Sequence, residues 1–189
     1  SHEIRMAGAT FGNYAADIKP IISAGSSDSA ALDAVFEMMV RGGRSAPMAK
    51  TMMVPESWSN LTVEMPKKWQ NMYAYCNSVM EPWDGPAAIC AVQGEWAIAG
   101  MDRNGLRPLR YTETDEYLVV GSETGMVKVD ESKIKEKGRV GPGQMIAVNF
   151  NQEKLYKDDD LKSYLSSSKP FSNWTKKITH IDKLVYEKY

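Results

Sequence analysis

Asp28 is the acidic residue whose position in the sequence points most directly to chemistry. It stands between Ser27 and Ser29, just before an apolar pattern with helical spacing. One interpretation is a helix N-cap, whose side-chain oxygen accepts a backbone N–H at the positive end of the helix. The other is a carboxylate held at the helix mouth to bind a cationic group such as an α-ammonium. In that case Ser27 or Ser29 would cap the helix instead.

Other residues that could support catalysis lack the partners that the chemistry needs. Ser1 could act as an N-terminal nucleophile with its own α-amine as base, but a charged stretch follows it, whereas such nucleophiles begin a buried strand. Cys76 lies on the apolar stripe of an expected helix, which favours a buried, inert thiol. The carboxylates of Asp158, Asp159 and Asp160 are interpreted as a solvated helix cap.

The sequence contains no recognisable motif for a metal or a phosphate group. Its two cysteines and two histidines do not make a convincing zinc set. Gly141-Pro142-Gly143 is followed by neither a helical pattern nor a lysine–serine pair, so it does not match a phosphate-binding loop. We therefore expect no cofactor and no metal in this chain.

The composition is that of an ordinary globular protein. Of its 189 residues, 43% are hydrophobic and 25% are charged, and the formal net charge is -1. This balance gives no electrostatic reason to expect nucleic acid or an anionic membrane as a partner. No apolar run approaches the roughly 20 residues that a membrane span needs, and the first residues do not resemble a signal peptide. Two cysteines in a chain of this length favour a reducing, cytosolic setting.

Helical spacing dominates the first half of the chain. Apolar residues recur at i, i+3, i+4, i+7 and i+8 from Leu32 to Val40, and Gly42-Gly43 ends the pattern. A second, short helix is expected between Ser45 and Pro55, and a third over residues 66–80, because proline is favourable in a first helical turn. The paired methionines in these patterns are expected to fill the core.

After residue 85 the pattern changes to short apolar runs that are typical of strands. Residues 87–92 and 95–100 flank Gln93-Gly94, which predicts a hairpin of two buried strands. Further strands are expected at residues 109–112, 117–121, 126–129 and 145–150, with residues 138–143 as a connection. The element order, helices first and then antiparallel strands, predicts an α+β fold.

The last forty residues differ from the strand region that precedes them. A short helix is expected from Asp158 to Leu165, then a linker over residues 166–170. A final helix is expected where Trp174, Ile178, Ile181 and Val185 recur at helical spacing, with Ser172 as its cap. We therefore expect residues 1–150 to belong to one domain and residues 151–189 to form an exit helix and linker.

Several strings of the sequence together resemble one known family. The strings are Ser26-Ser27-Asp28-Ser29-Ala30-Ala31-Leu32-Asp33, Val40-Arg41-Gly42-Gly43-Arg44-Ser45, Met53-Val54-Pro55-Glu56-Ser57-Trp58, Met80-Glu81-Pro82-Trp83-Asp84-Gly85-Pro86-Ala87, Asp102-Arg103-Asn104-Gly105-Leu106-Arg107-Pro108-Leu109-Arg110-Tyr111 and Gly121-Ser122-Glu123-Thr124-Gly125. Their order and spacing are similar to those in the glutaminase domain of glutamate synthase large subunits, over about residues 4–151. The fourth and fifth strings point to this family rather than to class II glutamine amidotransferases in general.

The resemblance implies a fold and a mechanism for a longer parent protein. The fold is the four-layer αββα N-terminal-nucleophile hydrolase fold, of which residues 1–150 would be the C-terminal part. In the family an N-terminal cysteine attacks the side-chain amide of glutamine, and a loop asparagine and glycine hold the oxyanion. The released ammonia converts 2-oxoglutarate to glutamate at a flavin site, so FMN and an iron–sulfur cluster are implied for the parent.

Asp28 matches the family's acidic residue that binds the α-ammonium of glutamine. Arg103, Asn104, Gly105 and Arg107 match a turn near the pocket, for which a structural role is expected. No residue here matches the family's catalytic cysteine or oxyanion loop, so we expect no catalytic residue in this chain and no glutamine hydrolysis by it alone.

The expected partners are glutamine, the remaining domains of the parent and, through open sheet edges, a second copy of the chain. Neither nucleic acid nor a membrane is expected as a partner. The alternative function is a free-standing, non-catalytic glutamine-binding module. The location implied for the parent is the cytoplasm, or a plastid if the parent is plastidial.

Overall fold

The computed structural model describes residues 11–58 and 65–179. Helices come first along the chain and strands follow, as the sequence predicted. After a 3-10 turn, η1, at Gly12–Ala16, the helices are α2 (Asp28–Arg41), α3 (Ala46–Met53) and α4 (Lys67–Val79). The strands are β1 (Ala88–Gln93), β2 (Trp96–Met101), β3 (Arg110–Thr114), β4 (Leu118–Gly121), β5 (Ile134–Arg139), β6 (Met145–Asn149) and β7 (Lys154–Tyr156). A second 3-10 turn, η2 (Glu131–Lys133), precedes β5, and the helices α5 (Asp158–Ser167) and α6 (Phe171–Thr175) follow the last strand.

The strands form two antiparallel sheets. One sheet has four strands in the order β1-β2-β6-β7, and the other has three in the order β4-β3-β5. The hairpin predicted at Gln93-Gly94 is confirmed, with Gln93 opposite Trp96 and Ala88 opposite Met101. Mixed helices and antiparallel sheets confirm the α+β class.

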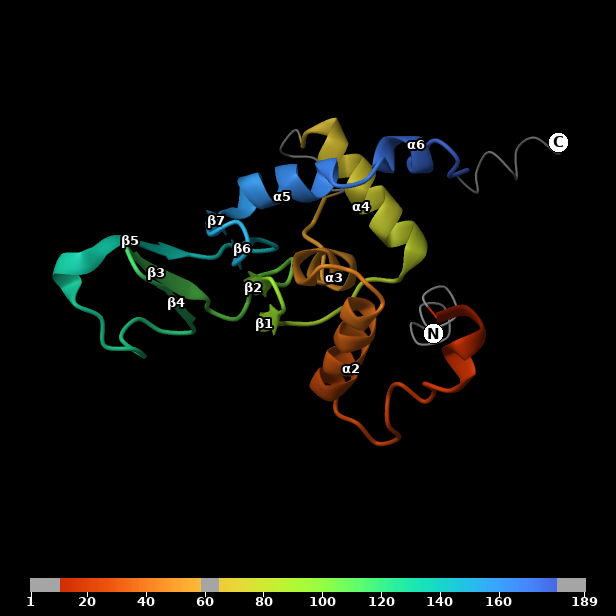
Figure 1. The fold of residues 1–189 in the computed structure, drawn as a ribbon, viewed down its shortest axis with the longest axis horizontal. Helices are drawn as coiled ribbons and strands as arrows, with labels where there is room; N and C mark the ends of the chain where they lie inside the picture. The colour runs from red at the N-terminus through yellow and green to blue at the C-terminus, as the bar shows by residue number, and fades with distance from the viewer. Residues whose placement is uncertain (1–10, 59–64, 180–189) are drawn as a thin grey trace.

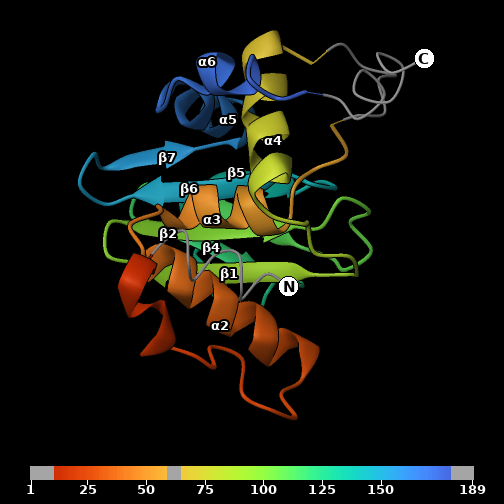
Figure 2. The ribbon, with the colours of Figure 1, turned by 90° about the vertical axis from the view of Figure 1, so that its right-hand side faces the viewer.

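A layer of helices covers one face of the four-stranded sheet, and the three-stranded sheet packs near its other face (Figure 1; Figure 2). Because side chains alternate along a strand, β2 contributes to both sides. Trp96 and Ile98 join the large helix-side core, whereas Ala99 and Met101 join a smaller core with Leu109, which directly precedes β3 of the second sheet. The molecule is therefore built in layers of helices, sheet and sheet.

The three predicted helices are confirmed at nearly the predicted bounds. The apolar face of α2 buries Leu32, Val35 and Met39, and Gly43 follows the helix with a positive φ of 91°. In α3, Pro47 occupies a first-turn position, where its missing N–H costs no hydrogen bond. The paired methionines of α2 and α3 are buried, which confirms that they fill the core.

One predicted strand is wrong, and two observed strands were not predicted. Residues 126–129 form no strand, because Met126 and Val127 are exposed and have no pairing partner in either described sheet. The third strand of the three-stranded sheet is β5 instead, which pairs with the side of β3 away from β4. Its sequence, IKEKGR, is too charged to show an apolar alternation. At this pair Tyr111 lies opposite Gly138, where a side chain on the glycine would collide with the tyrosine ring. The short strand β7 was also missed.

The C-terminal helices pack on the same core as the first three. Leu161 and Leu165 of α5 and Phe171 of α6 are buried in the helix-side core. α5 continues through Ser167, so the predicted linker at residues 166–170 is shorter than expected. α6 begins at Phe171 with Pro170 as its N-cap, so Ser172 does not cap it. α6 ends at Thr175, so Ile178, which was predicted to lie on the final helix, follows it instead. Ile181 and Val185 lie outside the described residues, and the division at residue 150 stays a prediction.

No membrane-spanning segment was expected from the sequence, and the length and composition of the observed helices can be compared with that expectation. Among those in the described part of the chain, none combines the length and apolar composition needed to cross a bilayer.

Candidate functional site

In the first turn of α2, the N-cap and the free carboxylate are two different residues. Ser27 is the N-cap, with extended backbone, and its Oγ accepts the backbone N–H of Ala30 at 3.3 Å. Asp28 is the first residue of the helix and is exposed. The capping role that the sequence left open thus falls to Ser27. Asp28 therefore presents a carboxylate at the helix end that favours negative charge.

The nearest cavity to Asp28 along the chain is apolar. It measures about 150 Å³ and is lined by Ala31 and Leu32 of α2, and by Met80 and Trp83 from the segment after α4. Asp28 does not line it, and the cavities found among residues 11–58 and 65–179 do not include Asp28. A concavity around its carboxylate therefore stays a prediction.

The turn after β2, residues 102–105, is organised by a buried aspartate. Asp102 is only 3% exposed, and its Oδ2 accepts the backbone N–H groups of Asn104 at 2.9 Å and Gly105 at 3.2 Å. Gly105 has a positive φ of 61°, which a side chain would strain. An aspartate that bonds to the backbone two and three residues ahead is a common turn former.

Asp102 also joins this turn to two other segments. Its Oδ1 accepts the N–H of Ala87 at 3.1 Å, and its backbone oxygen accepts the N–H of Gly143 at 2.7 Å. Gly105 lies against Pro142, where a Cβ would come within 2.8 Å of the ring. Three loops that are distant in sequence are therefore held together, and we call this arrangement the Asp102 clasp.

The four predicted near-pocket residues all lie on or beside this turn. Arg103 and Asn104 line a cavity of about 250 Å³ with Trp83 and Gly85. Gly105 supports the turn as described, and Arg107 is exposed and does not line that cavity. The positive φ and the contact with Pro142 explain why residue 105 is a glycine, and Arg103 and Asn104 lie on a cavity wall.

A mostly buried ionic cluster joins α5 and α4 to Glu56, which follows α3. The sequence did not reveal it. Lys162 of α5 places Nζ 2.7 Å from Glu56 Oε1 and 2.5 Å from Asp158 Oδ2. Tyr73 of α4 donates a hydrogen bond to Glu56 at 2.6 Å. Burial raises the pKa of Tyr73 well above 10.0, and Glu56 adds to the effect. Burial alone would lower the pKa of Lys162, but Asp158 and Glu56 outweigh it and raise that pKa.

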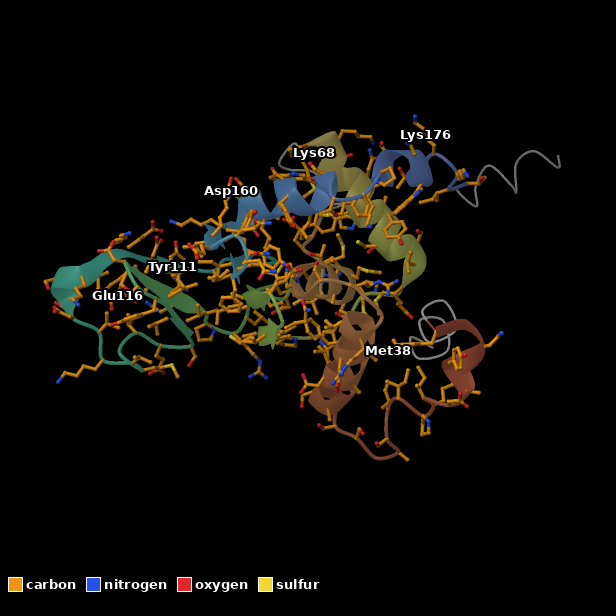
Figure 3. The ribbon with its side chains drawn as sticks, in the orientation of Figure 1. Met38, Lys68, Tyr111, Glu116, Asp160 and Lys176 are labelled. Carbon is orange, nitrogen blue, oxygen red and sulfur yellow. The ribbon has the colours of Figure 1, made fainter. Side chains whose placement is uncertain are left out.

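The prediction that residues 158–160 form a solvated helix cap is wrong for Asp158. The three aspartates were expected to form a solvated cap, and Asp159 and Asp160 are indeed exposed, with Asp160 pointing away from the fold (Figure 3). Asp158 instead turns inward, where its Oδ1 accepts the backbone N–H of Met145 at 2.9 Å. Burial raises the pKa of Asp158, while Lys162 opposes this shift. The first carboxylate therefore ties α5 to β6.

Lys50 of α3 lies beside this cluster and is 2% exposed. Its Nζ donates to the backbone oxygen of Gly143 at 3.3 Å, and its stem passes Gly100, where a Cβ would be 2.8 Å from Lys50 Cε. Burial lowers the pKa of Lys50 from 10.5 to about 8, although Asp158 and Glu56 act in the opposite direction. Lys50 thus supports the loop that the Asp102 clasp also holds.

A signal for Lys50 existed in the sequence. Ala46, Ala49, Lys50 and Met53 follow the i, i+3, i+4, i+7 spacing of a buried helix face, and all are buried. A lysine on that face needs a buried acceptor or a carboxylate. Its partners could not be found in this way, since Gly143 and Asp158 are far away in sequence.

Burial raises the pKa of both cysteines, which disfavours a reactive thiolate. Cys76 is buried on α4, as predicted, and burial raises its pKa from 9.0 to about 12. Cys90 is exposed on β1, and both thiols are free. Among the described residues no group of three or more His, Cys, Asp or Glu side chains is arranged to hold a metal ion. Ser1, His2 and His180 lie outside the described residues.

Comparison with known proteins shows the family to which this chain belongs. A family model described as glutamine amidotransferases class-II matches residues 1–174. The chain belongs to the class-II glutamine amidotransferases. The observed order of helices and then antiparallel sheets shows a mixed α+β fold, and membership of this family implies the N-terminal-nucleophile hydrolase fold.

Its relatives are large glutamate synthases. The chain is 53% identical over 186 residues to the glutamate synthase (NADPH) large chain of Azospirillum brasilense, with 98% of this chain covered and 12% of that protein. It is 40% identical over 189 residues to ferredoxin-dependent glutamate synthase 1, chloroplastic/mitochondrial, of Arabidopsis thaliana, again covering 98% of this chain and 12% of the relative. The glutamate synthase (NADPH) large chain of Bacillus subtilis is 36% identical over 175 residues, 92% of this chain and 11% of that protein.

These findings confirm the family that the strings predicted. The chain corresponds to part of the class-II amidotransferase region of glutamate synthase large chains, and it spans about 12% of the length of the first two relatives. The relatives include proteins named for NADPH and proteins named for ferredoxin, so the resemblance does not select an electron donor for a parent of this chain.

Proposed function

We propose that this chain is the part of a glutamate synthase glutaminase domain that holds the α-ammonium of glutamine through Asp28. The observation that supports this role is that different residues cap α2 and present a carboxylate at its first turn. Ser27 caps the helix, so the carboxylate of Asp28 is not needed as the cap. A carboxylate at the positive end of a helix is a stable negative charge, and such a charge attracts an ammonium group.

The chemical step belongs to the parent in this proposal. The parent hydrolyses glutamine and passes ammonia to 2-oxoglutarate to make glutamate, in keeping with the names of the relatives. The family's cysteine nucleophile and oxyanion loop have no matching residues in this sequence, so the chain alone would be inactive. Its own contribution is to bind and orient substrate. The Asp102 clasp and the buried cluster hold the loops and helices elsewhere in the fold together.

The proposal also covers fold and setting. The layers of helices, sheet and sheet are part of the four-layer αββα N-terminal-nucleophile hydrolase fold, and residues 151–189 lead toward the next region of the parent. FMN and the iron–sulfur cluster are assigned to other regions of the parent. Here Cys76 is buried, and the described residues gather no set of metal ligands. The parent would work in the cytoplasm, or in a plastid.

Substitution of Asp28 in the complete parent tests this role. Asp28→Asn keeps the shape of the side chain but removes its charge, so the KM for glutamine should rise by about 10- to 150-fold. This range corresponds to the loss of one charge-assisted hydrogen bond, worth roughly 1.5–3 kcal/mol. The value of kcat at saturating glutamine should change far less, because binding rather than the chemical step is weakened.

Asp33→Asn is the matched control. Asp33 is exposed on the same helix, beyond its first turn, so this variant should keep the KM of the parent. An unchanged KM in a correctly folded Asp28→Asn enzyme would restrict Asp28 to a favourable charge at the start of α2 and would remove the basis of the proposal.

A further inference from the structure

A polar cavity of about 250 Å³ lies between the segment that follows α3 and the turn held by Asp102. Its walls come from residues 54–58, Asn77 of α4, Pro82, Trp83 and Gly85, and residues 102–104. Asp28 and the rest of α2 do not contribute to it. The volume is slightly below the range typical of drug-sized ligands, so it suits a smaller metabolite.

Trp83 brings a hydrogen-bond donor to this cavity that has no protein acceptor among the described residues. Its Nε1 is buried and lacks a hydrogen-bond partner there. Gly85, which also lines the cavity, lies beside this nitrogen, and a Cβ there would be 3.3 Å from it. A side chain at this position, where φ is 143°, would therefore crowd the indole N–H. A buried donor of this kind is stabilised when a ligand supplies an acceptor oxygen.

Arg103 brings a positive charge to the same wall. Its Nη2 lies 3.3 Å from Asp84 Oδ1, but the two side chains are 55% and 85% exposed. An ion pair as exposed as this is weak, so a ligand can displace Asp84 without a large loss. The guanidinium group binds carboxylates through two parallel N–H donors, which a lysine cannot do.

The two donors are held in place relative to each other. Asp102 Oδ1 accepts the N–H of Ala87, at the end of the loop that carries Trp83, and Oδ2 accepts the N–H of Asn104, next to Arg103. The backbone N–H of Trp83 also donates to Met53 O at 2.6 Å. A site whose walls are fixed before binding loses less entropy when the ligand arrives.

The charge of the cavity favours a single negative charge on the ligand. Among the described residues that line it, Arg103 is the one cation, and the other donors, from Trp83 and the side-chain amides of Asn77 and Asn104, are neutral. Glu56 and Asp102 also line the cavity. Lys162 lies 2.7 Å from Glu56 Oε1 and offsets its charge, and the Asp102 carboxylate accepts three backbone N–H groups. A carboxylate matches this set, whereas a doubly charged phosphate would call for more cations.

We infer that this cavity binds the carboxylate of a small amino acid or oxo acid, with Arg103 and Trp83 Nε1 as the two donors. The side chains of Asn77 and Asn104 face the remainder of the ligand. This site is separate from Asp28 and does not depend on the proposed role of that residue.

Binding to the purified 189-residue chain tests the inference. Glutamate, glutamine and 2-oxoglutarate all carry a carboxylate and are titrated separately, by calorimetry and by the NMR signals of the tryptophan indole N–H groups. We expect saturable binding of at least one of them. The Trp83 indole signal, identified as the one absent in Trp83→Phe, should move during that titration.

Substitutions in and outside the cavity distinguish binding there from a general attraction between charges. Arg103→Gln should weaken binding by about 10-fold or more, because a charge-assisted contact is lost. Trp83→Phe keeps an aromatic ring and should weaken it by about 5-fold. Arg107→Gln removes an exposed arginine that does not line the cavity, so its affinity should stay within about 2-fold. Asp28→Asn should likewise leave this affinity unchanged.

Three results would overturn the inference. One is the absence of saturable binding for all three carboxylates. Another is an equal loss of affinity in Arg103→Gln and Arg107→Gln, which would indicate general attraction between charges. The third is binding that Asp28→Asn abolishes and Arg103→Gln leaves intact, which would assign the ligand to the Asp28 site alone and so favour the proposed function over this cavity.

Discussion

Lys50 carries its ammonium group into a region from which water is excluded. The side chain is 2% exposed, and its Nζ donates a hydrogen bond to a neutral carbonyl, Gly143 O. Asp158, Glu56, Lys162 and Asp102 all act on it electrostatically. Burial outweighs the carboxylates among them and lowers the pKa of Lys50 to about 8. Folding therefore favours the neutral form of this amine.

This shift predicts how stability depends on pH. In the unfolded chain Lys50 keeps its proton up to about pH 10.5, whereas in the folded chain it loses the proton near pH 8. Between these values the unfolded state binds more protons, so the free energy of unfolding rises with pH. Between about pH 7 and about pH 9.5 it should rise by about 2 kcal/mol more than in Lys50→Met, since one pKa unit corresponds to about 1.4 kcal/mol. Denaturant unfolding at the two pH values measures this difference.

Lys68→Met is the matched control for Lys50→Met. Lys68 is exposed on α4 and points to solvent (Figure 3), so its variant should keep the pH dependence of the unmodified chain. Parallel pH dependences for the unmodified chain and Lys50→Met would show that Lys50 has its ordinary pKa in the folded state.

At the residue scale, the sequence predicts local roles better than distant ones. Ser27 as the alternative cap beside Asp28 was predictable, because N-capping depends on residues only three apart. The clasp of Asp102 on Ala87 and Gly143 was not, since one partner is 15 residues away and the other 41 residues along the chain. Buried charge pairs such as Lys162 with Glu56 depend on tertiary packing and leave no local signal.

At the scale of elements, helices were predicted more accurately than strands. The apolar stripes of α2, α3 and α4 are long enough to reveal their period, and all three helices are present. The hairpin of β1 and β2 was predicted from apolar runs flanking Gln93-Gly94. β5 escaped because its residues are mostly charged, and its position depends on pairing with β3. Sheet pairing is set by contacts between distant segments, which one sequence does not reveal.

In the part of the chain that the structure describes, β1 is an edge strand without the features that usually protect an edge. Its sequence, AICAVQ, has no charged residue and no proline, and its residues alternate between exposed and half-buried. Val92 is 76% exposed. Beside it a cavity of about 480 Å³ is lined by Phe36 and Val40 of α2 and by Val92. An edge with these properties readily pairs with another strand.

Self-association of the isolated chain is therefore expected. Light scattering at several dilutions should detect an edge-paired or domain-swapped homodimer. Val92→Lys should shift it toward monomer, because an edge lysine opposes pairing. Val127→Lys is the control, since Val127 is exposed outside the described strands and should leave the dimer intact. A strict monomer at high concentration that binds no hydrophobic dye would contradict this expectation.

At the scale of the whole molecule, the described residues form a layered body with two cores. The larger core unites α2 to α6 with one face of the four-stranded sheet, and the smaller core lies between the sheets. The early segment contributes Phe11, Ile21 and Ile22 to the larger core, and its residues before 11 lie outside the described part. This body provides a frame for Asp28 and for the cavity that Arg103 lines.

The central claim is that this chain supplies binding groups and structural support while the chemistry of glutamine hydrolysis lies elsewhere in the parent. Release of ammonia from glutamine tests it most directly. The purified chain should release ammonia no faster than a buffer blank, whereas the complete amidotransferase domain of the parent should do so readily. Loss of even one oxyanion donor costs about 3–4 kcal/mol of transition-state stabilisation. Glutamine-dependent release by the chain alone, persisting in both Ser1→Ala and Cys76→Ala, would contradict the account, because it would require a nucleophile within these 189 residues.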